Sequence, residues 1–350
     1  MNTAVAINIL EIIVLIVSAK IRNIFPGYKG TMQGGATRLQ FRKTVHIFAM
    51  TIEEAIMGKN YSFIRELGGI LMAAADLVMP RECIVCGKTL LRHEKYLCIY
   101  CAADLPLTYY WERRRNPMAD KVNALVQQSV TEDFISTSAQ ESSVGNSRQD
   151  DGSRRTSRMR FSYAAALFLY HGENGYRRIP QRLKYMGDLG EGRFFSGMLG
   201  GFLNGSPLFS DIDLIIPVPL HWARRLKRGY NQAEVIARAI SEKSGRMPVR
   251  TDILIRKRHT RTQTKLNVNE KCKNVQGAFA LSRKARQGLA GTGNGGYCGG
   301  SELAGVRHVL LVDDVFTTGA TMSACLAVLQ PFFGPSVRIS CATLGFVDNG

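Results

Sequence analysis

The chain has 350 residues, of which 45% are hydrophobic, enough for one large globular domain or two smaller ones. Its formal charge of +18 indicates an anionic partner, such as nucleic acid, a nucleotide, a sugar phosphate or acidic lipid, without choosing among them. The eight cysteines include two close pairs, Cys83/Cys86 and Cys98/Cys101. This pattern does not fit a secreted disulfide framework, and it indicates a cytoplasmic protein with one metal site.

The amino-terminal segment 4–19 is apolar but contains Asn8 and Glu11. It is shorter than the roughly 20 residues that a membrane-spanning helix needs, and no basic stretch precedes it as in a signal peptide. A membrane anchor is therefore the less favoured interpretation. In the alternative, translation starts at Met50 or Met57 and residues 1–56 are an unrelated extension. We treat residues 1–62 as an extension of doubtful status.

The next part of the chain predicts a small module and a linker. Apolar residues at helical spacing predict a helix over residues 63–78, which Pro80 ends. That helix and the four paired cysteines form a module over residues 63–112. Residues 113–160 are expected to link it to the rest of the chain. Their polar, serine-rich stretch 136–158 predicts a disordered insertion.

Residues 161–350 alternate predicted strands and helices. Strands are expected at 163–170, 213–218, 251–256, 277–281, 309–312 and 337–344. Helices are expected at 189–203, 231–243 and 319–330, with Asn231 as a cap. We expect Pro180 to kink or shorten any helix near Leu183, and the six glycines of residues 291–300 to form a loop. This alternation predicts an α/β fold with a parallel sheet covered by helices.

The four paired cysteines predict a structural metal site. Cys83-x-x-Cys86 and Cys98-x-x-Cys101 are two chelating turns that can close a tetrahedral shell of four sulfur atoms around Zn²⁺. Four protein ligands leave no open position, which favours a structural role over a catalytic one. An iron–sulfur cluster is the weaker alternative, and free cysteines in a core are the simplest one.

Residues 309–321 predict a site for a sugar phosphate. An apolar run is followed by Asp313 and Asp314, and then by a short loop that opens a helix. Such a loop directs backbone N–H groups and the positive helix end at an anion. The loop residues are Thr317, Thr318, Gly319, Ala320 and Thr321. An ordinary helix cap after an acidic strand end is one alternative. The other is the acidic pair of a nucleotide hydrolase, which the chain's lack of a G-x-x-x-x-G-K-[ST] motif disfavours.

Two basic segments follow other predicted strands. The first carries Arg224, Arg225, Lys227 and Arg228, which suit a pyrophosphate group, although a solvated basic turn would read the same way. The second runs over residues 256–265 and includes Arg261, with Lys271 just beyond it.

Several segments resemble one known family when taken in order. LKYMGD, PVPLHWARRLKRGYNQAE, RTQTKLN, NVQGAF and VLLVDDVFTTGAT, preceded by the cysteine pairs, are similar to the ComF family over residues 63–112 and 161–346. The last segment resembles the 5-phosphoribosyl-1-pyrophosphate (PRPP) signature of type I phosphoribosyltransferases. Three features depart from the family: Lys271 stands where Arg is usual, the 136–158 and glycine-rich segments are extra, and Pro180 interrupts a regular helix.

The resemblance implies a type I phosphoribosyltransferase fold for residues 161–350, with a zinc ribbon before it. Asp313 and Asp314 would hold the ribose hydroxyls, and Thr317–Thr321 would cradle the 5′-phosphate. Magnesium would accompany PRPP, and the 256–265 segment would be a mobile catalytic loop.

Two functions follow from this resemblance. One is phosphoribosyl transfer by an enzyme. The other is a non-catalytic competence protein that senses PRPP or binds single-stranded DNA and works with DNA-uptake proteins. In the second case Arg113–Arg115 would supply charge. The aromatic side chains that could stack on bases are Tyr100, Tyr109, Tyr110 and Trp111.

Overall fold

The computed structural model describes residues 80–127, 160–258 apart from 173 and 246, 275, 277–290, 303 and 305–347. Apart from Pro80 and Arg81, these residues belong to one compact unit, Glu82–Gly350. Several expectations concern residues outside this description. They are the apolar segment 4–19, the helix at 63–78, the insertion 136–158, the glycine-rich segment 291–300, Arg261 and Lys271.

The main sheet contains four parallel strands in the order β1, β6, β5, β2. Their bounds are Ala164–Tyr170 for β1, Leu214–Pro217 for β2, His308–Phe316 for β5 and Arg338–Val347 for β6. The expectation of an α/β fold with a parallel sheet is therefore confirmed. The finer assignment to the type I phosphoribosyltransferase fold stays a prediction.

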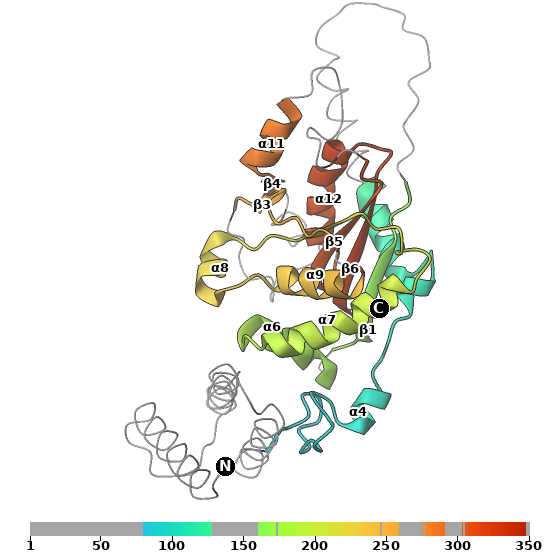
Figure 1. The fold of residues 1–350 in the computed structure, drawn as a ribbon, viewed down its shortest axis with the longest axis vertical. Helices are drawn as coiled ribbons and strands as arrows, with labels where there is room; N and C mark the ends of the chain where they lie inside the picture. Colours follow the sequence, from blue (N-terminus) through green and yellow to red (C-terminus); the bar gives the residue numbers. More distant parts are fainter. Residues whose placement is uncertain are drawn as a thin grey trace, which may run out of the picture. The chain divides into compact units, whose positions relative to one another are not determined.

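The sheet lies at the centre of the hydrophobic core. Every residue of β6 between its two ends is buried, so both faces of the sheet are covered. Helices α7 (Leu189–Asn204) and α9 (Gln232–Lys243) pack against each other and contact the strands (Figure 1). They approach closely at Gly200, where a Cβ atom would lie 2.9 Å from the Cα atom of Ile240. Helix α12 (Ala320–Phe333) packs against β5 and β6.

The remaining described elements are short. They are α4 (Ile99–Ala103), the 3-10 turns η1 (Tyr110–Glu112) and η2 (Gly175–Arg177), α6 (Arg178–Tyr185), α8 (Trp222–Arg228), α11 (Arg283–Ala290) and a helix over residues 117–127. Strands β3 (Leu254–Arg256) and β4 (Phe279–Leu281) form a separate antiparallel pair. Within the described ranges, no helix combines the length and the apolar character that crossing a bilayer requires.

Strand β5 is longer than the sequence predicts. It continues past Val312 to Phe316, because its backbone pairs in parallel with β6 as far as Phe346. Asp313 and Asp314 therefore lie within the strand rather than after it.

Two helical segments also differ from expectation. Pro180 does not interrupt α6, because it lies in the first helical turn, where a backbone N–H has no intrahelical acceptor. Residues 222–228, expected as a loop, form α8. The His221 side chain accepts a hydrogen bond from the N–H of Ala223 at its start, and Gly229 in the left-handed region (φ 80°) ends it. Asn231 caps α9 as predicted, accepting from the N–H of Ala233.

A buried histidine ties the amino ends of three strands together. His308 is 1% exposed, and its Nδ1 and Nε2 each lie 2.7 Å from an oxygen, of Asp211 and Ser340 respectively. Ser340 also accepts a hydrogen bond from the N–H of Tyr163, just before β1. Burial lowers the pKa of His308 below its ordinary value, although the Asp211 carboxylate opposes that shift. The imidazole is therefore neutral in the folded protein near pH 7.

This network predicts a pH dependence of stability. Because the folded-state pKa of His308 is lowered, the unfolded state binds more protons below about pH 6.5, so the free energy of unfolding falls as the pH drops through that value. His308→Gln should lower the free energy of unfolding by about 1–3 kcal/mol at pH 7.5 and flatten its dependence between pH 5 and 6.5. Urea denaturation at a series of pH values measures both effects.

The exposed His93 supplies the control for this test. His93→Gln should keep both the stability and its pH dependence. An unchanged pH profile in His308→Gln would contradict the assignment.

Candidate functional site

The predicted phosphate-binding segment surrounds a hollow between β5 and α12. Its lining residues are Asp313, Val315, Phe316, Thr317, Thr318, Gly319, Ala320, Thr321 and Met322. The structure therefore brings Asp313 and all five predicted loop residues together around one space. Asp314, the next residue along β5, instead contacts Lys184.

Gly319 is required where the loop turns into α12. Its φ of 81° is in the left-handed region, which side chains other than hydrogen rarely adopt. A Cβ atom at this position would lie 2.7 Å from both Leu125 Cδ1 and Phe316 Cζ. The turn directs the first N–H groups of a 14-residue helix toward the hollow, where an anion would be stabilised.

The two adjacent carboxylates strongly affect each other. Burial and the neighbouring Asp314 charge raise the pKa of Asp313 to about 7. The N–H of Asp314 donates to the Asp313 carboxylate at 2.9 Å and favours its charged form. The charges of Lys184 and Arg256 act in the same direction. This pair is suited to accept hydrogen bonds from neutral hydroxyl groups and to respond to an added cation.

Cations from two separate elements approach the acid pair. Lys184 of α6 places its Nζ 3.0 Å from Asp314 Oδ1. Arg256 of β3 interacts with Asp313, and its pKa is lowered by burial and by the nearby charge of Arg224 on α8. Arg224 of α8 therefore lies near Arg256, and its expected role toward a pyrophosphate group stays a prediction.

Sequence reasoning assigned no role to Lys184 or Arg256. Lys184 lies within the LKYMGD segment and Arg256 begins the second basic stretch. The LKYMGD segment was the available signal for Lys184, because a short motif far from the acids in the sequence indicates that its lysine has a role.

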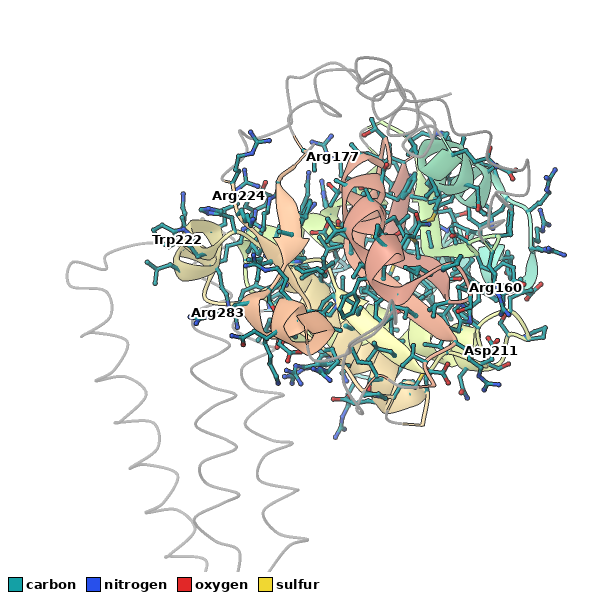
Figure 2. All side chains as sticks on the ribbon, turned by 90° about the horizontal axis from the view of Figure 1, so that it is seen from above. Arg160, Arg177, Asp211, Trp222, Arg224 and Arg283 are labelled. Atoms are coloured by element: carbon teal, nitrogen blue, oxygen red, sulfur yellow. The ribbon has the colours of Figure 1, made fainter. Side chains whose placement is uncertain are left out.

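Helix α8 carries two half-buried arginines, Arg224 and Arg228. The guanidinium of Arg228 lies 5.5 Å from the Tyr185 ring centroid at the end of α6. Burial and the charge of Arg228 lower the pKa of Arg224. Trp222 is 70% exposed. In Figure 2, Trp222 and Arg224 lie at one side of the molecule and Asp211 at the other, so the buried histidine network is remote from α8.

The four paired cysteines converge as predicted. The Sγ atoms of Cys83, Cys86, Cys98 and Cys101 all lie within 4.8 Å of one another. Those of Cys86 and Cys98 are 3.6 Å apart. Sulfur atoms at about 2.3 Å from a tetrahedral Zn²⁺ are separated by about 3.8 Å, so the cluster fits this ion.

The pKa values of two thiols in the cluster move in opposite directions, lowered for Cys83 and raised for Cys101 by burial. Burial alone would raise the pKa of Cys83, but hydrogen bonds from backbone N–H groups, including those of Cys86 and Cys98, lower it to about 7. A thiolate is the species that binds zinc.

The cysteine module is attached to the segment that carries Lys184. The Tyr176 hydroxyl donates to the carbonyl of Cys101 at 2.9 Å, and Arg178 Nη1 donates to the carbonyl of Val85 at 3.1 Å. Tyr176 lies in η2, which leads into α6, and Arg178 begins α6. The cysteine cluster and the Lys184–Asp314 contact are therefore connected by this helix.

Two of the four aromatic residues proposed for base stacking are buried. Trp111 is 3% exposed and stacks on Phe202, with ring centroids 4.4 Å apart. Tyr110 is 8% exposed and meets Phe346 edge-on. Tyr100 and Tyr109 are exposed. Tyr110 and Trp111 therefore serve packing.

Comparison with known proteins finds relatives with names that concern DNA. Competence protein F of Haemophilus influenzae is 32% identical over 118 residues, which are 34% of this chain and 44% of the relative. DNA utilization protein YhgH of Escherichia coli K12 is 28% identical over 129 residues, 37% of this chain and 48% of the relative. The same-named protein of Salmonella typhi matches to the same extent.

The chain spans about half the length of the curated relatives it matches. No protein-family model matches it. Over about a third of its residues, however, the chain is similar to these proteins, which confirms the resemblance that the order of motifs predicts.

Proposed function

We propose that this protein binds a 5-phosphoribosyl ligand, PRPP with magnesium, in the hollow between β5 and α12. The observation that carries the proposal is that one space is lined by Asp313 and by the whole Thr317–Thr321 loop at the start of a helix. A ligand with a phosphate at one end and a vicinal diol at the other matches those two groups of donors and acceptors.

Each part of the ligand has a matching part of the protein. The 5′-phosphate would accept hydrogen bonds from the N–H groups and hydroxyls of the loop, close to the positive end of α12. The ribose hydroxyls would donate to Asp313 and Asp314. The pyrophosphate would face Arg224 and Arg228 of α8, and Arg261 and Lys271, outside the described residues, are expected to join them.

Transfer of the phosphoribosyl group is the reaction this arrangement suits. The bond between the sugar C1 and the pyrophosphate oxygen would break, and a bond from C1 to an acceptor nucleophile would form as that nucleophile loses a proton. The protein's part is to hold the sugar by its phosphate and diol and to neutralise the leaving group. Magnesium, when bound with PRPP, supplies further positive charge at the pyrophosphate.

The relatives suggest the setting in which the site works. Their names refer to competence and DNA utilization, and we propose a role in DNA uptake or nucleotide metabolism for this chain. Binding of PRPP without turnover, as a sensor, is the alternative. A protein that binds single-stranded DNA is the other non-catalytic alternative. Tyr110 and Trp111 are buried, so they cannot stack on its bases.

The cysteine cluster is proposed to hold a structural Zn²⁺. With four sulfur ligands the ion would have no open coordination position, so it would fix the fold of the module and take no part in transfer.

Binding of PRPP should depend on both acids. Calorimetric titration should show binding that magnesium strengthens, and Asp313→Asn and Asp314→Asn should each weaken it at least tenfold, because each removes a charged acceptor of a hydrogen bond worth about 1.5–3 kcal/mol. Asp120→Asn, an exposed acid elsewhere, should bind normally. Wild-type protein that fails to bind PRPP would rule out the proposal, and binding without pyrophosphate release would leave the sensor.

The turn at Gly319 should be intolerant of any side chain. Gly319→Ala should lower the free energy of unfolding by about 1–3 kcal/mol and weaken PRPP binding, because the φ of 81° and the contacts to Leu125 and Phe316 both disfavour a Cβ atom. Gly201→Ala in α7 is the matched control, since a Cβ atom there meets nothing within 4 Å. Its stability should stay the same or rise by up to about 1 kcal/mol. Equal stability of the two variants would contradict this role of Gly319.

Metal content tests the cysteine site. Purified protein should contain one zinc ion per chain, and Cys101→Ser should reduce that content to near zero because a three-thiolate site holds the ion less tightly. Cys298→Ser, outside the two C-x-x-C pairs, should retain the metal. Iron in place of zinc, or zinc retained in Cys101→Ser, would overturn the assignment.

A further inference from the structure

Lys184 contacts Asp314, although the site predicted from the sequence does not include this lysine. Lys184 Nζ lies 3.0 Å from Asp314 Oδ1, and the two side chains are 29% and 12% exposed. Burial disfavours the ammonium charge, yet the Asp314 carboxylate, followed by Asp313 and Tyr170, raises the pKa of Lys184 above its ordinary value. The lysine is therefore charged and directed at the acids.

The Lys184 backbone is held in place by its neighbours. Leu183 is 1% exposed, and its carbonyl accepts a hydrogen bond from the Tyr230 hydroxyl. Gly192 of α7 allows the close approach, since a Cβ atom there would lie 2.6 Å from Leu183 Cδ1. A lysine on a mobile surface segment gains little from an ion pair, whereas one on a fixed helix end can orient its partner.

Asp313 and Asp314 each face a separate cation. Adjacent residues of a strand point to opposite faces of the sheet, so one cation cannot serve both carboxylates equally well. Arg256 interacts with Asp313, and Lys184 with Asp314. Because like charges on neighbouring residues repel, removal of either cation leaves a carboxylate without an opposing charge in a poorly hydrated place.

We propose that Lys184 is a positioning residue for the phosphoribosyl ligand, holding the Asp314 carboxylate in the orientation that accepts a sugar hydroxyl. This inference rests on the proposed function. When Asp314 Oδ1 accepts from the ammonium group, the second carboxylate oxygen keeps both of its lone pairs for the ligand. Lys184 acts through Asp314 and does not itself contact the sugar phosphate.

A double-mutant cycle tests this role. PRPP affinity with magnesium is measured by calorimetry for wild type, Lys184→Met, Asp314→Asn and the double variant. Lys184→Met should weaken binding roughly tenfold to a hundredfold, and it should have no further effect when Asp314→Asn is already present. Lys184→Arg, which keeps a cation, should recover part of the affinity.

Lys284→Met is the matched control. It also removes a lysine at 3.0 Å from an aspartate, here Asp252, but its side chain is 73% exposed. It should leave the affinity for PRPP unchanged. Thermal unfolding of each variant verifies that it folds, and Lys184→Gln replaces Lys184→Met if the latter does not.

The outcomes separate the two proposals. If wild type binds PRPP and Lys184→Met binds it with the same affinity, the role of Lys184 is overturned and the proposed function stands. A loss that persists in full on the Asp314→Asn background shows that Lys184 contacts the ligand directly and overturns the positioning role. Absence of binding in wild type overturns the proposed function and this inference with it.

Discussion

Two carboxylates on consecutive residues of a largely buried strand repel each other, and this repulsion shapes the site. Asp313 has a pKa raised to about 7 by burial and by the charge of Asp314, so its charged form depends on the cations that face it. Lys184 and Arg256 supply those charges from separate elements. Buried ion pairs contribute little to the free energy of unfolding, so stability does not explain this arrangement. Perturbed carboxylates facing buried cations are typical of a binding site.

The parallel sheet allows residues from distant parts of the sequence to meet. In such a sheet the carboxyl ends of all strands lie at one edge, and the segments that follow them converge there. β5 contributes the acids and the loop into α12, whereas β2 leads into the basic helix α8. The opposite edge carries the neutral His308 network, which joins the strands through a buried imidazole.

The sequence predicted what depends on local pattern. The apolar run ending at Val312, the Gly319 turn and the two cysteine pairs each carry their signal within a few residues. Helix α8 was missed because its apolar residues, Trp222 and Leu226, are exposed and give no buried face to recognise. The pairing of Lys184 with Asp314 could not be read from either segment alone, since it depends on how α6 packs against the sheet.

Helix α6 connects the two halves of the described unit. Its first residue, Arg178, holds the carbonyl of Val85 between the first two cysteines, and Lys184 lies near its other end. Eight helical residues span about 12 Å and bend little, so the helix transmits displacement as a short rod. A change in the cysteine cluster would therefore reach the Lys184–Asp314 contact through a single rigid element, because the two contacts lie at its opposite ends.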